Sequence, residues 1–162
     1  MPRHHESRQL PYTARQMYDL VADVQHYPEF LPWNSAARIN SRVPVMGGAP
    51  GDEVIEADLV ISFKVFRERF GSRVTLLPGP GLIHTQYLDG PFKRLKSTWA
   101  FAERPATADM PISCQVTFDV DFEFRNAILA TVIGLVFNEA MARVVRAFES
   151  RAKAVYGTAY KG

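Results

Sequence analysis

The sequence contains one cysteine, Cys114, and four histidines among 162 residues. A single thiol excludes an intramolecular disulfide and a multi-cysteine zinc site. Nineteen lysines and arginines face 17 acidic residues, so the net charge of +2 lacks the basic excess typical of nucleic-acid binding. The longest uncharged apolar run, residues 127–137, is shorter than the roughly 20 residues needed to cross a bilayer. The first nine residues also lack a signal-peptide core. We therefore expect a soluble protein, at most peripheral to a membrane.

Signatures of catalysis are also missing. The sequence contains no phosphate loop, metal-ligand spacing or serine elbow. His84 and Asp89 differ by five positions, so on a straight strand they point to opposite faces. We expect His26 to be a solvated loop residue near Glu29, and Cys114 to be an inert buried thiol. The sequence thus predicts a protein that is not an enzyme and that has no metal or cofactor.

Length and composition favour one domain. The chain has a mass of 18.3 kDa and is 47% hydrophobic and 12% aromatic, which is enough to bury a core without disulfides. We expect a single domain over residues 1–162, with an ordered core from about 4 to 156. Turn-forming stretches at 44–51, 78–81, 89–91 and 104–111 separate segments of strand length. This spacing is typical of an antiparallel meander.

Alternation of apolar and polar residues is clearest over residues 112–124. One side of that segment is wholly apolar: Ile112, Cys114, Val116, Phe118, Val120, Phe122 and Phe124. Residues 55–65 and 95–101 alternate in the same way, and 4–10 and 38–43 are further strand candidates. Strands with one apolar and one polar face indicate an antiparallel sheet covered by helices on one side.

Two helices complete the predicted fold. The first covers about 13–23, where Thr13 and Gln16 form a capping-box pattern. The second covers about 126–156 and ends at Gly157; its second half is amphipathic and its first half is apolar nearly all round, so we expect partners on every side there. Gly134 would allow close approach of a ligand or of the sheet. The expected fold is α+β and of the helix-grip type, a curved antiparallel sheet of about six or seven strands around a long C-terminal helix, with an apolar cavity.

Residues 23–34, DVQHYPEFLPWN, form the most unusual local sequence. Pro28 can start a helical turn and Pro32 stops one, so we expect at most a single turn between them. That turn would present four large side chains, Tyr27, Phe30, Leu31 and Trp33. They either plug one end of the core or form a lid over the mouth of an apolar pocket.

Other apolar side chains are candidates for the wall of such a pocket. They are Phe63, Phe70, Trp99, Phe101, Phe118 and Phe122 on the strands, and Ile133, Phe137 and Met141 on the long helix. An apolar pocket with a few polar groups suits a hydrophobic ligand. The alternative is that these side chains simply fill a core.

Opposite charges are arranged to pair across strands. Asp119, Asp121 and Glu123 can face Arg94 and Lys96, and Glu56 and Asp58 can face Arg69 and Arg73. Residues 67–96 keep a local charge of +4, six basic residues less Glu68 and Asp89. Such a region could meet ribosomal RNA or anionic lipid head groups.

Three stretches, VADVQHYPEFLPW, ISFKVFRERFGSRVTL and YLDGPFKRLKSTWAF, resemble the coenzyme Q-binding family of START-like domains. That family lies within the polyketide cyclase/dehydrase-like superfamily and includes bacterial ribosome-association toxins. The similarity extends from about His5 to Tyr156. One departure is Asn34, because family members commonly carry a cysteine after the tryptophan, so no role of that thiol transfers.

The resemblance implies a tunnel between the sheet and the C-terminal helix that binds ubiquinone (coenzyme Q) or a related isoprenoid lipid. The protein would then be a carrier or chaperone that supports respiratory electron transport. It would be cytoplasmic, of bacterial type, and in peripheral contact with the inner membrane. The alternative that the resemblance implies is a translation inhibitor, the toxin of a toxin–antitoxin pair, which binds the large ribosomal subunit. DNA is not an expected partner.

Overall fold

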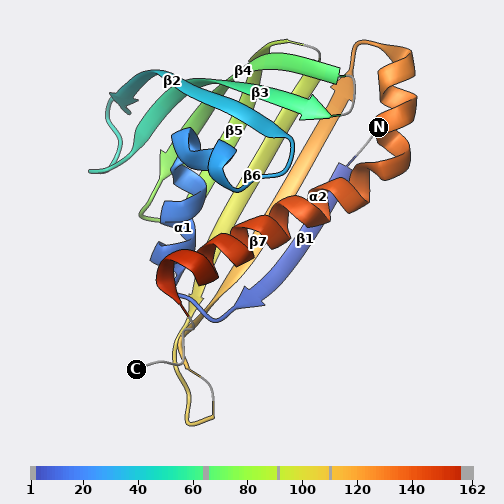
Figure 1. Ribbon diagram of the computed structural model, residues 1–162. Helices are drawn as coiled ribbons and strands as arrows, with labels where there is room; N and C mark the ends of the chain where they lie inside the picture. The colour runs from blue at the N-terminus through green and yellow to red at the C-terminus, as the bar shows by residue number, and fades with distance from the viewer. Residues whose placement is uncertain (1–2, 64–65, 91, 110, 158–162) are drawn as a thin grey trace.

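A computed structural model describes residues 3–63, 66–90, 92–109 and 111–157 (Figure 1). Within these ranges, the side chains at 63, 66, 129, 132, 133, 136 and 137 lie outside the description. The elements in chain order are β1 (Arg3–Leu10), α1 (Ala14–Ala22), the 3₁₀ helix η1 (Val24–Glu29), β2 (Asn34–Pro44), β3 (Glu53–Phe63), β4 (Phe66–Leu77), β5 (Leu82–Asp89), β6 (Phe92–Arg104), β7 (Ser113–Phe124) and α2 (Ala127–Tyr156).

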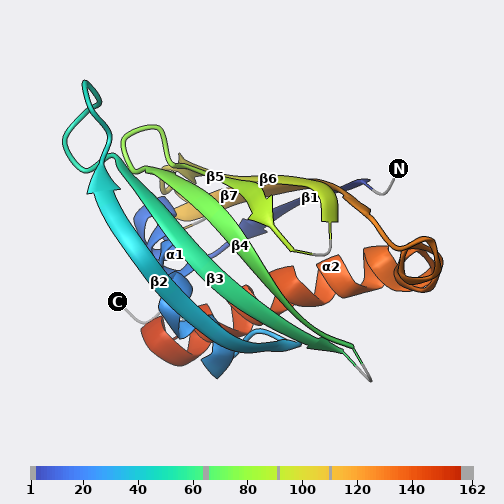
Figure 2. The same ribbon diagram turned by 90° about the horizontal axis from the view of Figure 1, so that it is seen from above.

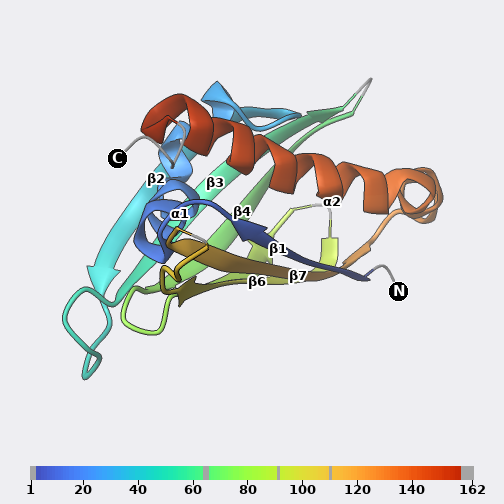
Figure 3. The ribbon, with the colours of Figure 1, turned by 90° about the horizontal axis from the view of Figure 1, so that it is seen from below.

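The seven strands form one sheet in the order β1-β7-β6-β5-β4-β3-β2, and the paired strands are antiparallel. From β2 to β7 each strand pairs with the next one, which confirms the meander, and β1 returns to pair with β7. Figures 2 and 3 show the sheet curving around α2, and α1 lies on the same side of the sheet. The α+β helix-grip architecture is therefore confirmed.

The outer face of the sheet carries the predicted cross-strand ion pairs of Arg69, Arg73 and Arg94. Arg69 lies 2.7 Å from Asp58, and Arg73 lies 3.5 Å from Glu56. The Arg94 guanidinium lies 2.9 Å from Glu123 and 3.0 Å from Asp121. Since Arg69, Arg73 and Arg94 all have carboxylate partners, much of the basic excess counted over residues 67–96 is neutralised locally.

Both predicted helices are present and end as their sequences indicate. The Thr13 side chain accepts a hydrogen bond from the Gln16 N–H at 3.1 Å, and the Gln16 side chain accepts one from the Thr13 N–H at 2.9 Å. This reciprocal pair is the predicted capping box. At the other end of the chain, Gly157 follows α2 with a φ of +74°, the left-handed conformation that glycine adopts most easily after a helix.

The first turns of α2 differ from the expectation that they are covered on every side. The Ile128 residue is 74% exposed and Leu135 is 83% exposed. Figures 1 and 2 show these turns running in a different direction from the rest of the helix. The prediction that Gly134 allows close approach of the sheet is also wrong, because a Cβ built there meets no atom of the described chain within 4 Å. Apolar residues along the chain predicted the helix, but the bend in α2 decides which part of the sheet the helix covers.

The helical turn at Pro28 begins earlier than expected. Pro28 does not start it but lies inside η1, and the fixed φ of proline is compatible with a 3₁₀ conformation. Between Pro28 and Pro32 the chain makes no more than the single predicted turn, in which the Leu31 N–H donates to the Tyr27 carbonyl at 2.9 Å. His26 therefore lies on η1 rather than on an irregular loop, with its Nδ1 atom 2.7 Å from Asp23. Trp33 then reverses the chain with a φ of +62°, and its carbonyl accepts a 2.7 Å hydrogen bond from Ser62 N–H.

Candidate functional site

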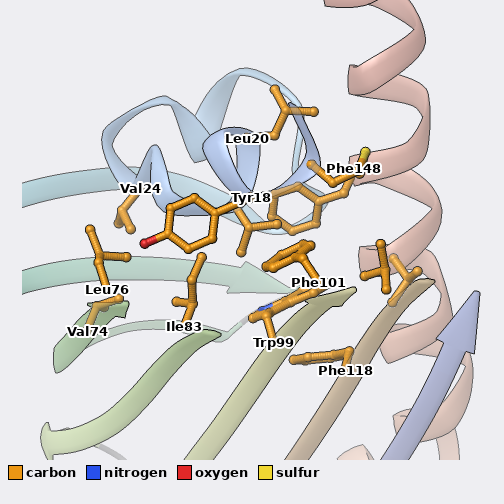
Figure 4. Close-up of a cluster of buried hydrophobic side chains, with 14 of the residues drawn as sticks. Tyr18, Leu20, Val24, Val74, Leu76, Ile83, Trp99, Phe101, Phe118 and Phe148 are labelled. Atoms are coloured by element: carbon orange, nitrogen blue, oxygen red, sulfur yellow. The ribbon is translucent and has the colours of Figure 1, made fainter. Parts of the chain in front are cut away.

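The concave face of the sheet carries two groups of aromatic side chains, one toward each end of the strands. The first, which we call the Trp99 cluster, comprises Tyr18, Trp99, Phe101, Phe118 and Phe148 (Figure 4). The Trp99 ring stacks on Phe118 with centroids 4.2 Å apart, and Phe148 of α2 meets it edge-on at 5.2 Å. Tyr18 of α1 meets Phe101 at 5.8 Å. This end of the face is therefore filled by α1 and by the second half of α2.

Residues 27–33 close the Trp99 cluster from outside. Tyr27 and Phe30 both contact the Phe148 ring edge-on, at 5.6 and 5.2 Å. The Tyr27 hydroxyl donates to the Val21 carbonyl, and burial raises its pKa. The Arg151 guanidinium lies 5.1 Å above the Phe30 ring, a cation–π contact that also holds this segment against α2.

The second group, the Phe92 cluster, comprises Phe70, Tyr87, Phe92, Phe122 and Phe124. The Phe92 ring is its centre and lies 4.7 to 5.7 Å from the other four rings. Three half-buried apolar residues, Leu59, Ile61 and Leu95, share the concave face with this cluster and keep part of their surface open. The apolar face is thus packed at the Trp99 end and incompletely covered at the Phe92 end.

The predicted pocket residues divide between these environments. Trp99, Phe101 and Phe118 lie in the Trp99 cluster, and Phe70 and Phe122 lie in the Phe92 cluster. Tyr27, Phe30, Leu31 and Met141 are partly buried against the core, and Trp33 is half-buried. The side chains of Phe63, Ile133 and Phe137 lie outside the described part of the structure.

Sequence reasoning missed the residue at the centre of the Phe92 cluster. In the sequence, Phe92 comes directly after the turn-forming residues Asp89-Gly90-Pro91, so no alternation of apolar and polar residues before it indicates which face its side chain occupies. The bulge between Phe92 and Arg94 also shifts the face onto which the first residue of β6 points. Tyr87 could have been found, because it continues the alternation of Ile83 and Thr85 along β5.

An open cavity of about 720 Å³ lies elsewhere, between α1 and the loops that join β2 to β3 and β4 to β5. Its lining is charged: Arg15 pairs with Asp19 at 3.0 Å, and Arg42 pairs with Glu53 at 3.2 Å. Tyr18 also lines it, and burial raises the pKa of the Tyr18 hydroxyl to about 12. Charged walls do not suit a hydrophobic ligand, so this cavity is not the predicted tunnel.

The environments of Cys114 and His26 perturb their protonation. The Cys114 thiol is fully buried, and burial raises its pKa to about 11. The hydrogen bond and the charge of Asp23 raise the pKa of His26. No group of three or more histidine, cysteine, aspartate or glutamate side chains that could hold a metal ion occurs in the described ranges. Among the same residues, no helix is long and apolar enough to span a membrane.

Comparison with known proteins adds relatives of two kinds. The ribosome association toxin RatA of Escherichia coli K12 is 36% identical over 156 residues, which cover 96% of this chain and 90% of the toxin. The mitochondrial coenzyme Q-binding protein COQ10 of Drosophila melanogaster is 33% identical over 138 residues, 85% of this chain. The match spans 52% of that longer protein.

Among solved structures, a START superfamily protein from Mycobacterium smegmatis superposes with a TM-score of 0.73 over 94% of this chain and 98% of its own. At 18% identity this likeness shows the fold alone. Residues 10–149 also match the family described as polyketide cyclase / dehydrase and lipid transport. These residues include the whole curved sheet except most of β1, as well as α1 and most of α2. The chain therefore belongs to the polyketide cyclase / dehydrase and lipid transport family, and its fold is START-like.

Proposed function

We propose that this protein binds a hydrophobic ligand, ubiquinone or a related isoprenoid lipid, on the concave face between the sheet and α2. In this proposal it is a carrier or chaperone for the lipid and supports respiratory electron transport without catalysing a reaction. The name of the Drosophila relative, a coenzyme Q-binding protein, supports the choice of quinone.

The observation that carries the proposal is the open apolar surface around the Phe92 cluster. Leu59, Ile61 and Leu95 lie on the helix-covered side of the sheet, yet each is only partly buried. Burying apolar surface contributes roughly 25 cal/mol per Å², so a flat lipid ring or an isoprenoid chain would gain stability by covering these side chains. The packed Trp99 cluster would limit how far such a ligand can enter.

The first test is extraction of lipid from protein purified out of its own cells, with native mass spectrometry. We expect a co-purifying quinone or related lipid.

A titration with decylubiquinone should then give weaker binding for Leu59→Gln, whose side chain faces the concave surface. Val60→Gln is the matched control, because it changes the neighbouring half-buried residue on the opposite face. Repeated recovery of lipid-free protein that does not bind decylubiquinone would refute the proposal.

Peripheral contact with the inner membrane belongs to the same proposal. Ile128 and Leu135 are two turns apart in the first part of α2 and both expose apolar side chains. This part of the helix follows directly on β7, whose last residue, Phe124, belongs to the Phe92 cluster. A bilayer surface would cover such side chains. Vesicle flotation should weaken for Leu135→Glu and be unchanged for Val155→Glu, which alters an exposed residue near the other end of the helix. Equal flotation of both variants would argue against this contact surface.

A second candidate function is translation inhibition through the large ribosomal subunit, as the toxin of a toxin–antitoxin pair. It is favoured by the match to the Escherichia coli toxin along nearly the whole of both chains. Contacts with RNA phosphates make binding strongly dependent on salt. Co-sedimentation with the large subunit at low salt, lost as salt rises, would support this function. Absence of co-sedimentation at low salt would count against it.

A further inference from the structure

Among the described residues of the concave face, four with hydroxyl groups interrupt its apolar surface between the Trp99 cluster and the Phe92 ring, one of them Tyr87 of the Phe92 cluster. They are Ser72 on β4, Thr85 and Tyr87 on β5, and Ser97 on β6. In the sheet register Ser72 is opposite Tyr87, and Thr85 is opposite Ser97. Thr85 and Ser97 are each two residues from the paired core residues Ile83 and Trp99, so all of these side chains share the concave face.

Two of the four hydroxyls have partners within the protein. The Ser72 hydroxyl, on a fully buried residue, donates to the Ala57 carbonyl at 3.3 Å. The Tyr87 hydroxyl accepts a 3.3 Å hydrogen bond from the Phe92 N–H. Both hydroxyls therefore take part in hydrogen bonds within the folded protein.

The other two, Thr85 and Ser97, are half-buried and have no hydrogen-bond partner among the described residues. By contrast, the neighbouring Thr98 on the opposite face has its hydroxyl 3.1 Å from the His84 Nδ1 atom. Neither hydroxyl oxygen is among the fully buried side-chain atoms that lack a partner in the described ranges, so both remain accessible on the uncovered part of the face. The Thr85–Ser97 pair therefore offers two free hydroxyls, side by side on an otherwise apolar surface, to a ligand that covers it.

We propose that Thr85 and Ser97 form a hydrogen-bonding subsite for an oxygen atom on the ring of the bound ligand. Directly opposed residues of an antiparallel pair have Cβ atoms about 4.5–5.5 Å apart. Since hydroxyl donors lie about 2.7–2.8 Å from their acceptors, one oxygen between the two side chains can accept from both. The subsite thus selects a ring that carries a carbonyl or ether oxygen.

The surroundings of the subsite set the orientation of that ligand. The ring rests beside Tyr87 and Leu95, and its apolar substituent follows Leu59 and Ile61 along the uncovered part of the face. The packed Trp99 cluster blocks the opposite direction. This inference rests on the proposed function and deepens it, because it states which part of the ligand binds where.

The test compares two probes, decylubiquinone and oxygen-free decylbenzene, by isothermal titration. A neutral hydrogen bond contributes about 0.5–1.5 kcal/mol, so the double variant Thr85→Val, Ser97→Ala should bind decylubiquinone roughly 5- to 150-fold more weakly. Its affinity for decylbenzene should not fall. Thr98→Val is the matched control, since it removes a hydroxyl from the outer face of the same strand, and both affinities should remain those of the wild type.

The outcomes separate the subsite from the function. If the double variant binds decylubiquinone as tightly as the wild type, or loses both probes equally, the subsite is refuted and the proposed function stands. If the wild type binds neither probe, the proposed function fails and the subsite fails with it.

The ligand-free double variant gives an independent measurement. Because it loses two hydroxyls that have no partner in the described chain, it should melt at or above the temperature of the wild type. A fall of more than about 4 °C, which corresponds to about 1 kcal/mol or more in a chain of this size, would show that the hydroxyls stabilise the fold and would overturn the inference.

Discussion

Replacing Trp99 by alanine should remove the centre of the packed end of the sheet. The Trp99 residue is 6% exposed and contacts three rings, those of Phe101, Phe118 and Phe148. Truncation of a buried tryptophan to alanine destabilises a protein by about 3–5 kcal/mol. In a chain of this size each kcal/mol lowers the melting temperature by about 2–4 °C. We therefore expect Trp99→Ala to melt about 6–20 °C below the wild type.

Thermal unfolding followed by circular dichroism provides the assay, and Trp33→Ala provides the control. Trp33 is half-buried in the chain reversal after η1, so its truncation should lower the melting temperature much less. If residues 27–33 act as a lid, Trp33→Ala should instead weaken decylubiquinone binding. Equal destabilisation by the two substitutions, with normal quinone binding by Trp33→Ala, would show that the segment is a plug. A Trp99→Ala protein that melts within about 2 °C of the wild type would refute the packing argument.

Three further predictions concern single residues. Cys114, with its pKa raised to about 11 by burial, should resist iodoacetamide at pH 8 in the native protein and react once guanidinium unfolds it; rapid native labelling would contradict this. His26 should titrate above 6.5 when followed by NMR. Because the pKa is raised in the folded state, the contribution of His26 to stability is present below about pH 6.5 and is lost as the pH rises through the folded pKa. A titration midpoint of His26 that does not change in Asp23→Asn would contradict the assigned cause. Gly134→Ala should stabilise the protein by about 0.5–1 kcal/mol, measured by urea unfolding, because a Cβ meets no atom of the described chain there; a loss of stability would mean that the helix bend requires glycine.

The sequence by itself determined the elements and the faces of the sheet. Alternation over 112–124 predicted β7 and which of its side chains point inward, because neighbouring side chains of a strand point to opposite faces. Thr13 with Gln16 predicted the start of α1, and Gly157 predicted the end of α2, because helix ends are set by local hydrogen bonds and backbone conformation. These features depend on residues close together in the chain.

Only the tertiary structure decided which apolar side chains are packed and which remain open. Trp99 and Leu95 both lie on the concave side of β6, but Phe148 covers Trp99 while Leu95 stays half-buried. Coverage of a strand residue depends on where a distant helix crosses the sheet, and the bend in α2 sets that crossing. The position of Thr85 directly opposite Ser97 is equally a tertiary property, because it depends on the register between β5 and β6, which no local pattern encodes. The same holds for the absence of a hydrogen-bond partner for these two hydroxyls among the described residues.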